Sequence, residues 1–178
     1  MVKEELYIRR AVKADAKLIT ELSEVTFFDT FYKTCTDEDM QVFIKEFFGE
    51  KQVNKELSDP NDFYFIAFIE KKAVGYIRIK EDESDIEVIK NSKGIELKRI
   101  YVLKEYHSKK VGARLMQFAL DFAAGKGYEL LWLGVWEHNE RALNFYKKFG
   151  FIDTGFKHPF PIGNTPQTDN WLIKFIQK

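Results

Sequence analysis

Residues 130–136, LLWLGVW, constrain the fold more than any other segment, because they form an apolar run without a polar side chain. A strand with one face in water alternates polar and apolar residues, whereas an uninterrupted run is typical of a strand covered on both faces. Residues 111–122 before this run and residues 139–150 after it carry apolar side chains at helical spacing. The segment therefore predicts a central sheet with helices on both faces, which is an α/β arrangement.

The rest of the chain supplies strands and helices in an order that suits this arrangement. Strands are predicted over 6–12, 63–70, 73–79, 94–103, 151–156 and 170–176, with Lys71 and Lys72 joining a hairpin. Helices are predicted from Asp15 to about Tyr32, over 40–48 and from Gly49 to about Ser58, and the acidic residues 81–85 are expected to form a loop. The first helix is expected to bury the stripe formed by Leu18, Leu22, Val25, Phe28 and Tyr32.

Composition is typical of a soluble globular protein, and residues 1–178 are expected to form one domain. The 28 basic and 28 acidic side chains cancel, which gives no reason to expect nucleic acid or a membrane as a partner. The start of the chain has no apolar core of the signal-peptide kind, so a cytoplasmic protein is expected. The single cysteine, Cys35, lies among acids that would raise its thiol pKa, so it is not expected to be a nucleophile.

Tyr146 stands out in NERALNFYKKFGF, residues 139–151, because it shares the apolar stripe of a short helix with Phe145 and Phe149. Asn139 suits the N-cap of that helix, and Gly150 suits its end. A tyrosine in such a stripe is most often a core aromatic whose hydroxyl has found a partner. The surrounding sequence has to decide between this interpretation and a functional one.

A second candidate site is the step from the strand over 94–103 to the helix that begins near Val111. The first turn of a helix has unpaired N–H groups and a partial positive charge, which suit a pyrophosphate. Lys109, Lys110 and Arg114 would add positive charge at this point. With Gly112 as its one glycine, the turn matches neither the dinucleotide fingerprint nor the P-loop, and a basic turn alone is more often only solvated.

Together these segments resemble the GNAT superfamily of acetyl-CoA-dependent N-acetyltransferases. NERALNFYKKFGF has every fixed residue of the family's N-x-x-A-x-x-F-Y-x-x-x-G-F segment. The turn HSKKVGA matches the Q/R-x-x-G-x-G/A pattern at Gly112 and Ala113, whereas His107 and Lys110 depart from it. The resemblance implies the GNAT fold, a mixed central sheet of about six to seven strands with helices on both faces. It also implies acetyl-CoA as co-substrate and no metal.

A narrower resemblance covers nearly the whole chain. The stretches VTFFDTF, IELKRIYVL, WLGVWEHNERALNFYKKFGF and QTD are similar to the bacterial PaiA-type polyamine acetyltransferases, which acetylate spermidine and spermine. This resemblance implies a cytoplasmic enzyme that acetylates a small-molecule amine and forms an oligomer, for which a homodimer is the expected form.

The resemblance assigns Tyr146 the role of the acid that protonates the departing thiolate, which the chemistry of a phenol allows. A base must also take a proton from the amine, since an alkylamine of pKa about 10.4 is deprotonated only about once in 2,500 molecules at pH 7. Glu96 is the first candidate base, although it could instead simply pair with Lys98 on the same strand face; Glu137 and His138 are the others. Cofactor binding is implied for Ile100, Tyr101, Val102, Ser108, Lys109, Lys110, Val111, Gly112, Ala113, Asn139 and Lys148.

The acceptor site is expected to place acids between aromatic side chains, because a polyamine combines spaced ammonium groups with an alkyl chain. The first two helices carry such acids, namely Glu24, Asp29, Asp37, Glu38 and Asp39. Asp29 is expected to be half-buried and to need a cationic partner, since most of its neighbours are apolar; Glu137 is the other predicted substrate-binding residue. The alternatives are a peptide or antibiotic amine as acceptor, and a regulator that binds acyl-CoA without turnover, which would not need Tyr146.

Overall fold

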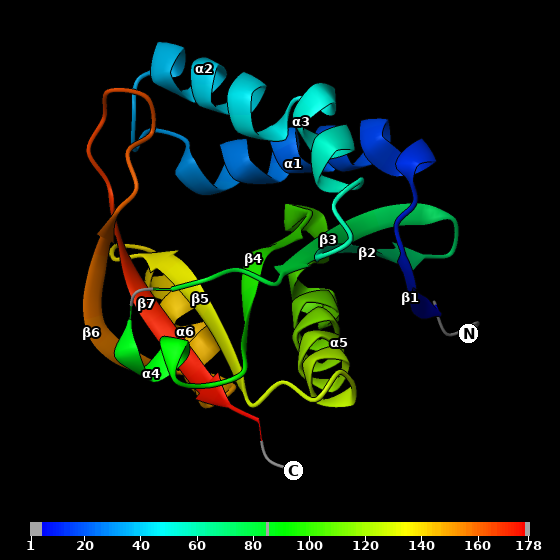
Figure 1. Cartoon of the computed structure of the whole chain (residues 1–178). Coiled ribbons are helices and arrows are strands. Elements are labelled where there is room, and N and C mark those ends of the chain that lie inside the picture. The colour runs from blue at the N-terminus through cyan, green and yellow to red at the C-terminus, as the bar shows by residue number, and fades with distance from the viewer. Residues whose placement is uncertain (1–4, 85, 177–178) are drawn as a thin grey trace.

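The computed structural model describes residues 5–84 and 86–176, so the two ends of the predicted domain and Asp85 of the acidic stretch lie outside the described residues. Within these ranges seven strands form one sheet in the order β1-β2-β3-β4-β5-β7-β6 (Figure 1). In chain order the strands are β1 (Leu6–Arg10), β2 (Asp62–Ile69), β3 (Lys72–Lys80), β4 (Gly94–Val102), β5 (Leu130–Trp136), β6 (Ile152–Pro159) and β7 (Thr168–Phe175). Among the strand pairs of the described residues only β4 and β5 run in parallel, so the predicted mixed sheet is confirmed.

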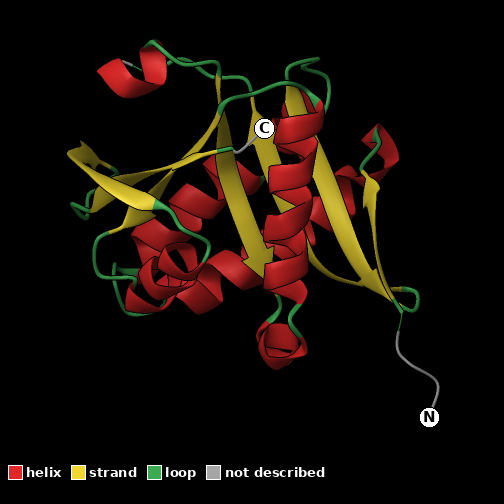
Figure 2. Cartoon of the chain, turned by 90° about the horizontal axis from the view of Figure 1, so that it is seen from below, coloured by secondary structure: helices red, strands yellow, loops and turns green. Residues whose placement is uncertain are grey.

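Helices cover both faces of the sheet, as Figures 1 and 2 show. They are α1 (Ala16–Phe31), α2 (Asp37–Phe48), α3 (Glu50–Glu56), α4 (Glu87–Lys90), α5 (Val111–Gly125) and α6 (Glu140–Lys148), with short 3₁₀ turns η1 (Lys13–Asp15) and η2 (Lys104–Lys109). One core joins α5 and α6 to the sheet, and two smaller cores lie under α1, α2 and α3 on the other face. The predicted α/β fold with two helical layers is therefore confirmed.

The apolar run of β5 is covered on both faces for a clear reason. Leu131, Leu133 and Val135 point into the core beneath α5 and α6. Leu130 and Trp132 point the other way, into a cluster that the short helix α4 completes. The sequence analysis did not predict α4, whose four residues are too few to show a helical period.

The predicted buried face of α1 is confirmed at Leu22 and, in part, at Leu18, but it is wrong in the second half of the helix. Val25, Phe28 and Tyr32 are exposed, and Phe27 and Phe31 are buried instead. The reason lies outside the helix, because Phe27 packs against Phe43 and Phe48 of α2 with ring centroids 4.9 Å apart in each pair. A helix that is apolar on two sides does not reveal which side its neighbours will cover.

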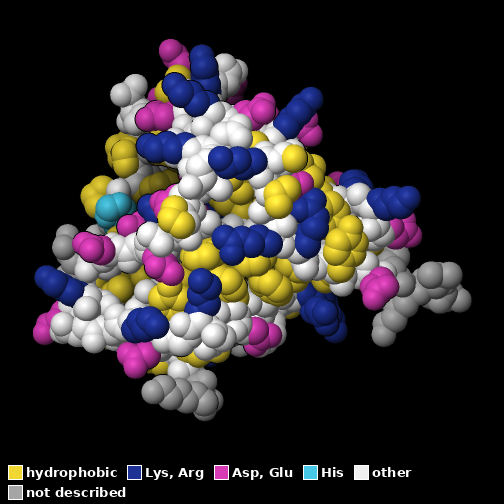
Figure 3. Space-filling view, turned by 45° about the vertical axis from the view of Figure 1, so that its right-hand side comes forward, with side chains coloured by type: hydrophobic (Ala, Val, Ile, Leu, Met, Phe, Trp, Pro, Cys, Tyr) yellow, Lys and Arg dark blue, Asp and Glu magenta, His cyan; other side chains and the backbone are white. Residues whose placement is uncertain are grey.

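The helix end predicted at Gly150 is confirmed. Gly127 and Gly150, just past the ends of α5 and α6, adopt positive φ angles of 73° and 80°, which a glycine adopts without steric cost. No helix among the described residues is long and apolar enough to cross a membrane. Figure 3 shows side chains of both charges interspersed with hydrophobic ones on one face of the molecule.

Candidate active site

The candidate site is a cavity that opens where β4 and β5 separate. Their parallel pairing covers only Gly94–Glu96 and Leu130–Trp132, and the strands diverge beyond these residues. The cavity has a volume of about 830 Å³ and is lined by Leu97–Val102 of β4 and by Gly134, Val135 and Trp136 of β5. A volume in this range suits a cofactor or a large metabolite.

A β-bulge in β4 shapes one wall of this cavity. Arg78 pairs with Arg99 and Ile79 pairs with Leu97, so Lys98 is an extra residue without a partner on β3. A bulge increases the local twist and re-aims the side chains that follow it. Leu97 and Ile100 consequently pack into the same core, while Tyr101 lies against the opposite one.

The peptide groups of Ile100 and Val102 face the gap between the strands. The next residue, Leu103, donates its N–H to Val74 of β3, and successive residues of an antiparallel pair turn their peptide groups to opposite sides. The Val102 carbonyl lies 2.8 Å from Nε2 of His107. Burial lowers the pKa of His107 and the charge of Arg141 acts in the same direction, so the ring is neutral at pH 7 and can donate to this carbonyl.

The N-terminus of α5 forms the basic end of the cavity, where Lys104, His107, Lys110 and Arg141 are among the lining residues. The N-cap residue, Lys110, makes no side-chain capping hydrogen bond, and the first turn contains no acid. Gly112 and Ala113 also line the cavity, so their first-turn N–H groups lie beside it. The departure from the glycine pattern has a visible consequence, since Lys110 adopts the left-handed conformation with φ of 59°.

Tyr146 lies in the cavity wall and in the core at once. Its side chain belongs to α6, is 8% exposed, and packs edge-on against Phe145 and Phe151. Burial raises the pKa of its hydroxyl, and the charge of Asp169 raises it further, so the phenol stays protonated at neutral pH. The rigid ring thus presents a proton donor to the cavity, which fits the functional interpretation of the stripe.

Glu96 is placed in agreement with both interpretations of it. Its carboxylate is buried in the cavity wall, and Lys98 Nζ lies 2.7 Å from its Oε2, so the predicted ion pair is confirmed. Lys98 also lies 3.0 Å from Asp82. Burial raises the pKa of Glu96, while the positive charge of Lys98 opposes that shift.

Asp169 of β7, together with Asp82 and Glu83 of the β3–α4 loop, forms an acidic group in the cavity wall that the sequence analysis missed. Asp169 Oδ2 lies 3.0 Å from the position that a Cβ on Gly134 would occupy, so the missing side chain of Gly134 makes room for this carboxylate. Asp169 belongs to the QTD stretch of the family resemblance, and that was the one signal available in the sequence.

Several predicted residues do not lie where they were expected. Asp29 lines the cavity but is exposed rather than half-buried, on the side of His107, whose pKa its charge raises. Glu137 lies outside the described cavity wall and pairs with Lys157 at 2.5 Å. Residues Ser108, Lys109 and Lys148 are exposed and Val111 is buried, and none of these four is among the lining residues. Asn139 does line the cavity, and its Oδ1 accepts a hydrogen bond of 3.1 Å from the Ala142 N–H, as a cap should.

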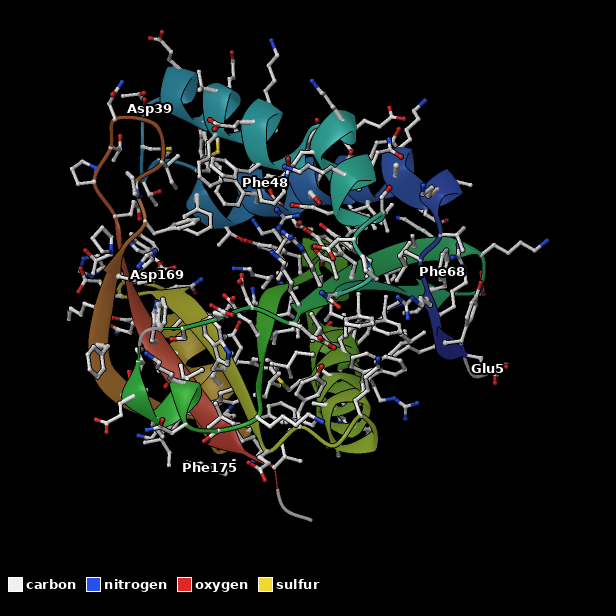
Figure 4. The ribbon with its side chains drawn as sticks, in the orientation of Figure 1. Glu5, Asp39, Phe48, Phe68, Asp169 and Phe175 are labelled. Carbon is white, nitrogen blue, oxygen red and sulfur yellow. The ribbon has the colours of Figure 1, made fainter. Side chains whose placement is uncertain are left out.

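The remaining acids of the first helices do not form the predicted pocket. Glu24, Asp37 and Glu38 are exposed and lie outside the cavity wall. Asp39 instead accepts hydrogen bonds from Asn164 N and Thr165 Oγ1, which fixes the loop between β6 and β7 (Figure 4). Cys35 behaves as predicted, because burial and the charge of Asp39 raise its thiol pKa.

Comparison with known proteins adds an independent line of information. Residues 19–151 match the profile of the acetyltransferase (GNAT) family. An uncharacterised N-acetyltransferase of Lactobacillus delbrueckii subsp. lactis is 35% identical over 155 residues, which are 87% of this chain and 88% of that protein. Streptothricin acetyltransferase A of Bacillus subtilis is 26% identical over 170 residues, 93% of this chain and 86% of that protein.

The fold is also shared with a solved structure. The crystal structure of the PaiA N-acetyltransferase of Thermoplasma acidophilum in complex with coenzyme A aligns with a TM-score of 0.79 at 22% sequence identity. The alignment covers 96% of this chain and 99% of that one. At this identity the comparison establishes a common fold.

Proposed function

The chain belongs to the acetyltransferase (GNAT) family, and on that premise we propose that it transfers the acetyl group of acetyl-CoA to a primary amine of a polyamine. The observation that carries this proposal is the distribution of charge in one cavity. Lys110 and Arg141 lie at the α5 end, and Asp82, Glu83 and Glu96 lie where β4 and β5 part. Val102 lies six positions after Glu96 along β4, a span of roughly 20 Å.

The basic end suits the phosphates of acetyl-CoA. An uncapped helix N-terminus with Gly112 and Ala113 in its first turn offers backbone N–H groups to an anion. Lys110, Lys104 and Arg141 add positive charge. The peptide groups of Ile100 and Val102 do not pair with β5 and would bind the amides of the pantetheine arm as a neighbouring strand would, with the Val102 carbonyl shared with His107.

The acidic end suits the acceptor. Asp82, Glu83 and Glu96 supply three carboxylates, of which Lys98 neutralises only part, so negative charge remains for an ammonium group. Trp171, which is partly exposed in the same wall and packs on the buried Trp132, supplies apolar surface for an alkyl chain. An aromatic face can also attract an ammonium group. This acidic wall replaces the one predicted on the first two helices.

The proposed chemistry needs no acyl-enzyme intermediate, because one cavity holds both ends of the reaction. Acetyl-CoA supplies an activated acetyl group as a thioester. The Tyr146 hydroxyl would protonate the leaving sulfur, Glu96 would help to bind the amine, and a carboxylate at the acidic end would accept a proton from it. Cys35, the single cysteine, is not among the lining residues.

A second acceptor class has one observation in its favour, which is the likeness to streptothricin acetyltransferase A along nearly the whole chain. An antibiotic amine would use the same Tyr146 and Glu96. It would differ from a polyamine in shape and in the spacing of its charges, and the carboxylates of Asp82, Glu83 and Glu96 in one cavity wall suit the spaced ammonium groups of a linear polyamine better.

Thiol release measured with acetyl-CoA and a panel of amines tests the proposal. We expect turnover with spermidine and spermine, and little above background with streptothricin, with a peptide bearing a free N-terminus or with a lysine-containing peptide. A preference for peptides or for streptothricin would contradict the polyamine proposal. Tight binding of CoA without thiol release from any amine would indicate a regulator instead.

Two substitutions of Lys110 separate its charge from its backbone strain. Lys110→Ala and Lys110→Gly should raise the KM for acetyl-CoA by the same few-fold, because both remove a positive charge from the phosphate end. Only Lys110→Gly should gain stability, by up to about 1 kcal/mol. The left-handed conformation costs a residue with a Cβ roughly 1–2 kcal/mol, which a glycine avoids. Part of this gain is cancelled because a glycine loses more conformational entropy when the chain folds. Urea denaturation checks the second effect, and equal stability of the two variants would show that the φ of 59° is not strained.

A further inference from the structure

Asp169 is a partly buried carboxylate, and no counter-ion for it is found in the part of the chain that the structure describes. It is the second residue of β7, at the end of the strand that follows the β6–β7 loop (Figure 4). Among residues 5–84 and 86–176, no side chain forms an ion pair or a hydrogen bond with its carboxylate. A buried charge without a partner is costly, and proteins seldom retain one without a ligand to pair with it.

None of the groups that face Asp169 stabilises its negative charge by an ion pair in the described residues, and one of them repels it. Glu96 of β4 is close enough for its negative charge to act on Asp169, and burial together with this charge raises the pKa of Asp169 to about 7. Tyr146 of α6 and Tyr101 of β4 are the neutral hydroxyl groups whose pKa values its charge raises. His158 of β6 is its neighbour across the β6–β7 ladder and is exposed.

The nearby lysine is already engaged. Lys98 Nζ lies 2.7 Å from Glu96 and 3.0 Å from Asp82, so it balances the acids on the β4 side of the cavity. Asp169 lines the same cavity from the β7 side, next to Tyr146 and over Gly134. A cationic ligand between Glu96 and Asp169 would satisfy the carboxylate that the fold leaves unpaired.

We propose that Asp169 takes the proton from the acceptor ammonium while Glu96 helps to hold that ammonium, an inference that rests on the proposed function. The ammonium group first passes one proton to the Asp169 carboxylate and becomes a neutral amine. Its nitrogen lone pair then forms a C–N bond to the acetyl carbon, and the C–S bond breaks with its electron pair on sulfur. The sulfur then takes the hydroxyl proton of Tyr146. The acylated nitrogen gives its second proton to the Tyr146 phenolate, which restores the hydroxyl. Asp169 finally releases the proton that it took from the ammonium to water.

The pH dependence of kcat/KM for spermidine tests this role. In the wild type, kcat/KM should rise up to about pH 7 and then level off, because ionised Asp169 accepts the proton of a protonated amine. In Asp169→Asn it should be lower by roughly tenfold or more at pH 7, with Glu96 remaining as a weaker substitute. As the pH rises further, kcat/KM of Asp169→Asn should increase with the fraction of deprotonated amine and approach the wild-type value near pH 9.5, because a free amine needs no base. The same loss at every pH, or no loss, would overturn the proposal.

A stability measurement gives a readout independent of activity. The folded-state pKa of Asp169 is raised above its unfolded value, so the ionised carboxylate destabilises the fold fully above about pH 7, and this penalty fades as the pH falls towards 4. Asp169→Asn should therefore unfold at a higher temperature than the wild type at pH 8, with the difference shrinking at low pH. A lower unfolding temperature at pH 8 would show that Asp169 serves the fold and would overturn the proposal.

Two controls make the outcomes distinguishable. Asp121→Asn, which alters an exposed carboxylate that accepts a hydrogen bond from Gln117 on α5, should change neither the pH profile nor the unfolding temperature at pH 8 appreciably. A wild type that releases no thiol with any amine would refute the proposed function itself. A wild type that turns over spermidine while Asp169→Asn keeps the same profile would refute the role of Asp169 alone.

Discussion

We expect Tyr146→Phe to lower kcat by roughly 10²-fold or more while the protein folds normally and keeps its KM for acetyl-CoA. The substitution removes one hydroxyl from a ring that Phe145 and Phe151 hold in the core. Burial raises the pKa of this hydroxyl, so it is protonated at neutral pH. It can therefore donate a hydrogen bond to the sulfur and pass its proton on once negative charge has developed there. Steady-state kinetics with saturating spermidine, together with a thermal unfolding curve, measures both parts of this expectation.

Tyr76→Phe is a suitable control for the same chemical change. Tyr76 is fully buried and its hydroxyl accepts a hydrogen bond from Ser23 at 2.8 Å, but it does not line the cavity. Its loss should reduce stability by about 1 kcal/mol and leave kcat nearly unchanged. If Tyr146→Phe kept full turnover with chemistry as the slow step, Tyr146 would not be the acid.

The second large effect is expected for Gly112→Asp, which should raise the KM for acetyl-CoA by about 10²-fold. A carboxylate in the first turn of α5 would repel the phosphates that the helix N-terminus and Lys110 attract. The fold should tolerate the side chain, since a Cβ on Gly112 would meet nothing nearer than Phe145 at 3.8 Å. Initial rates at varied acetyl-CoA give the KM directly.

Gly112→Ala separates the effect of charge from that of bulk. Its methyl group fits the same space, so its KM should rise far less than that of Gly112→Asp. A folded Gly112→Asp variant with an unaltered KM would place the phosphates of acetyl-CoA elsewhere on the molecule. Equal increases for both variants would show that backbone approach, rather than charge, controls binding at this turn.

The fold was predictable because its signals are local. The apolar run of β5, the hairpin of β2 and β3, and the helix end at Gly150 each depend on a few adjacent residues. The buried face of α1 was not predictable in the same way. It depends on Phe43 and Phe48 of α2, which pack on Phe27 from a separate helix.

The contrast between local signals and contacts of distant segments also explains which residues of the candidate site could be predicted. Tyr146, Glu96 and the turn at Gly112 were singled out from continuous motifs, and the structure brings all three to one cavity. Asp169 was missed as a site residue because its position depends on β7 lying beside β5 and on the absence of a side chain at Gly134. Glu137 was predicted to lie in the acceptor site, but it pairs with Lys157 instead. The sequence around Glu137 does not reveal this partner, because Lys157 is 20 residues away.

The most direct test of the central claim is a two-substrate initial-rate experiment, in which acetyl-CoA and spermidine are varied together and the product is identified by mass spectrometry. Because a single cavity carries both the basic and the acidic end, we expect intersecting double-reciprocal lines and a singly N-acetylated polyamine. Parallel lines would indicate an acyl-enzyme and contradict direct attack. Thiol release without an N-acetylated product would contradict transfer to the amine altogether.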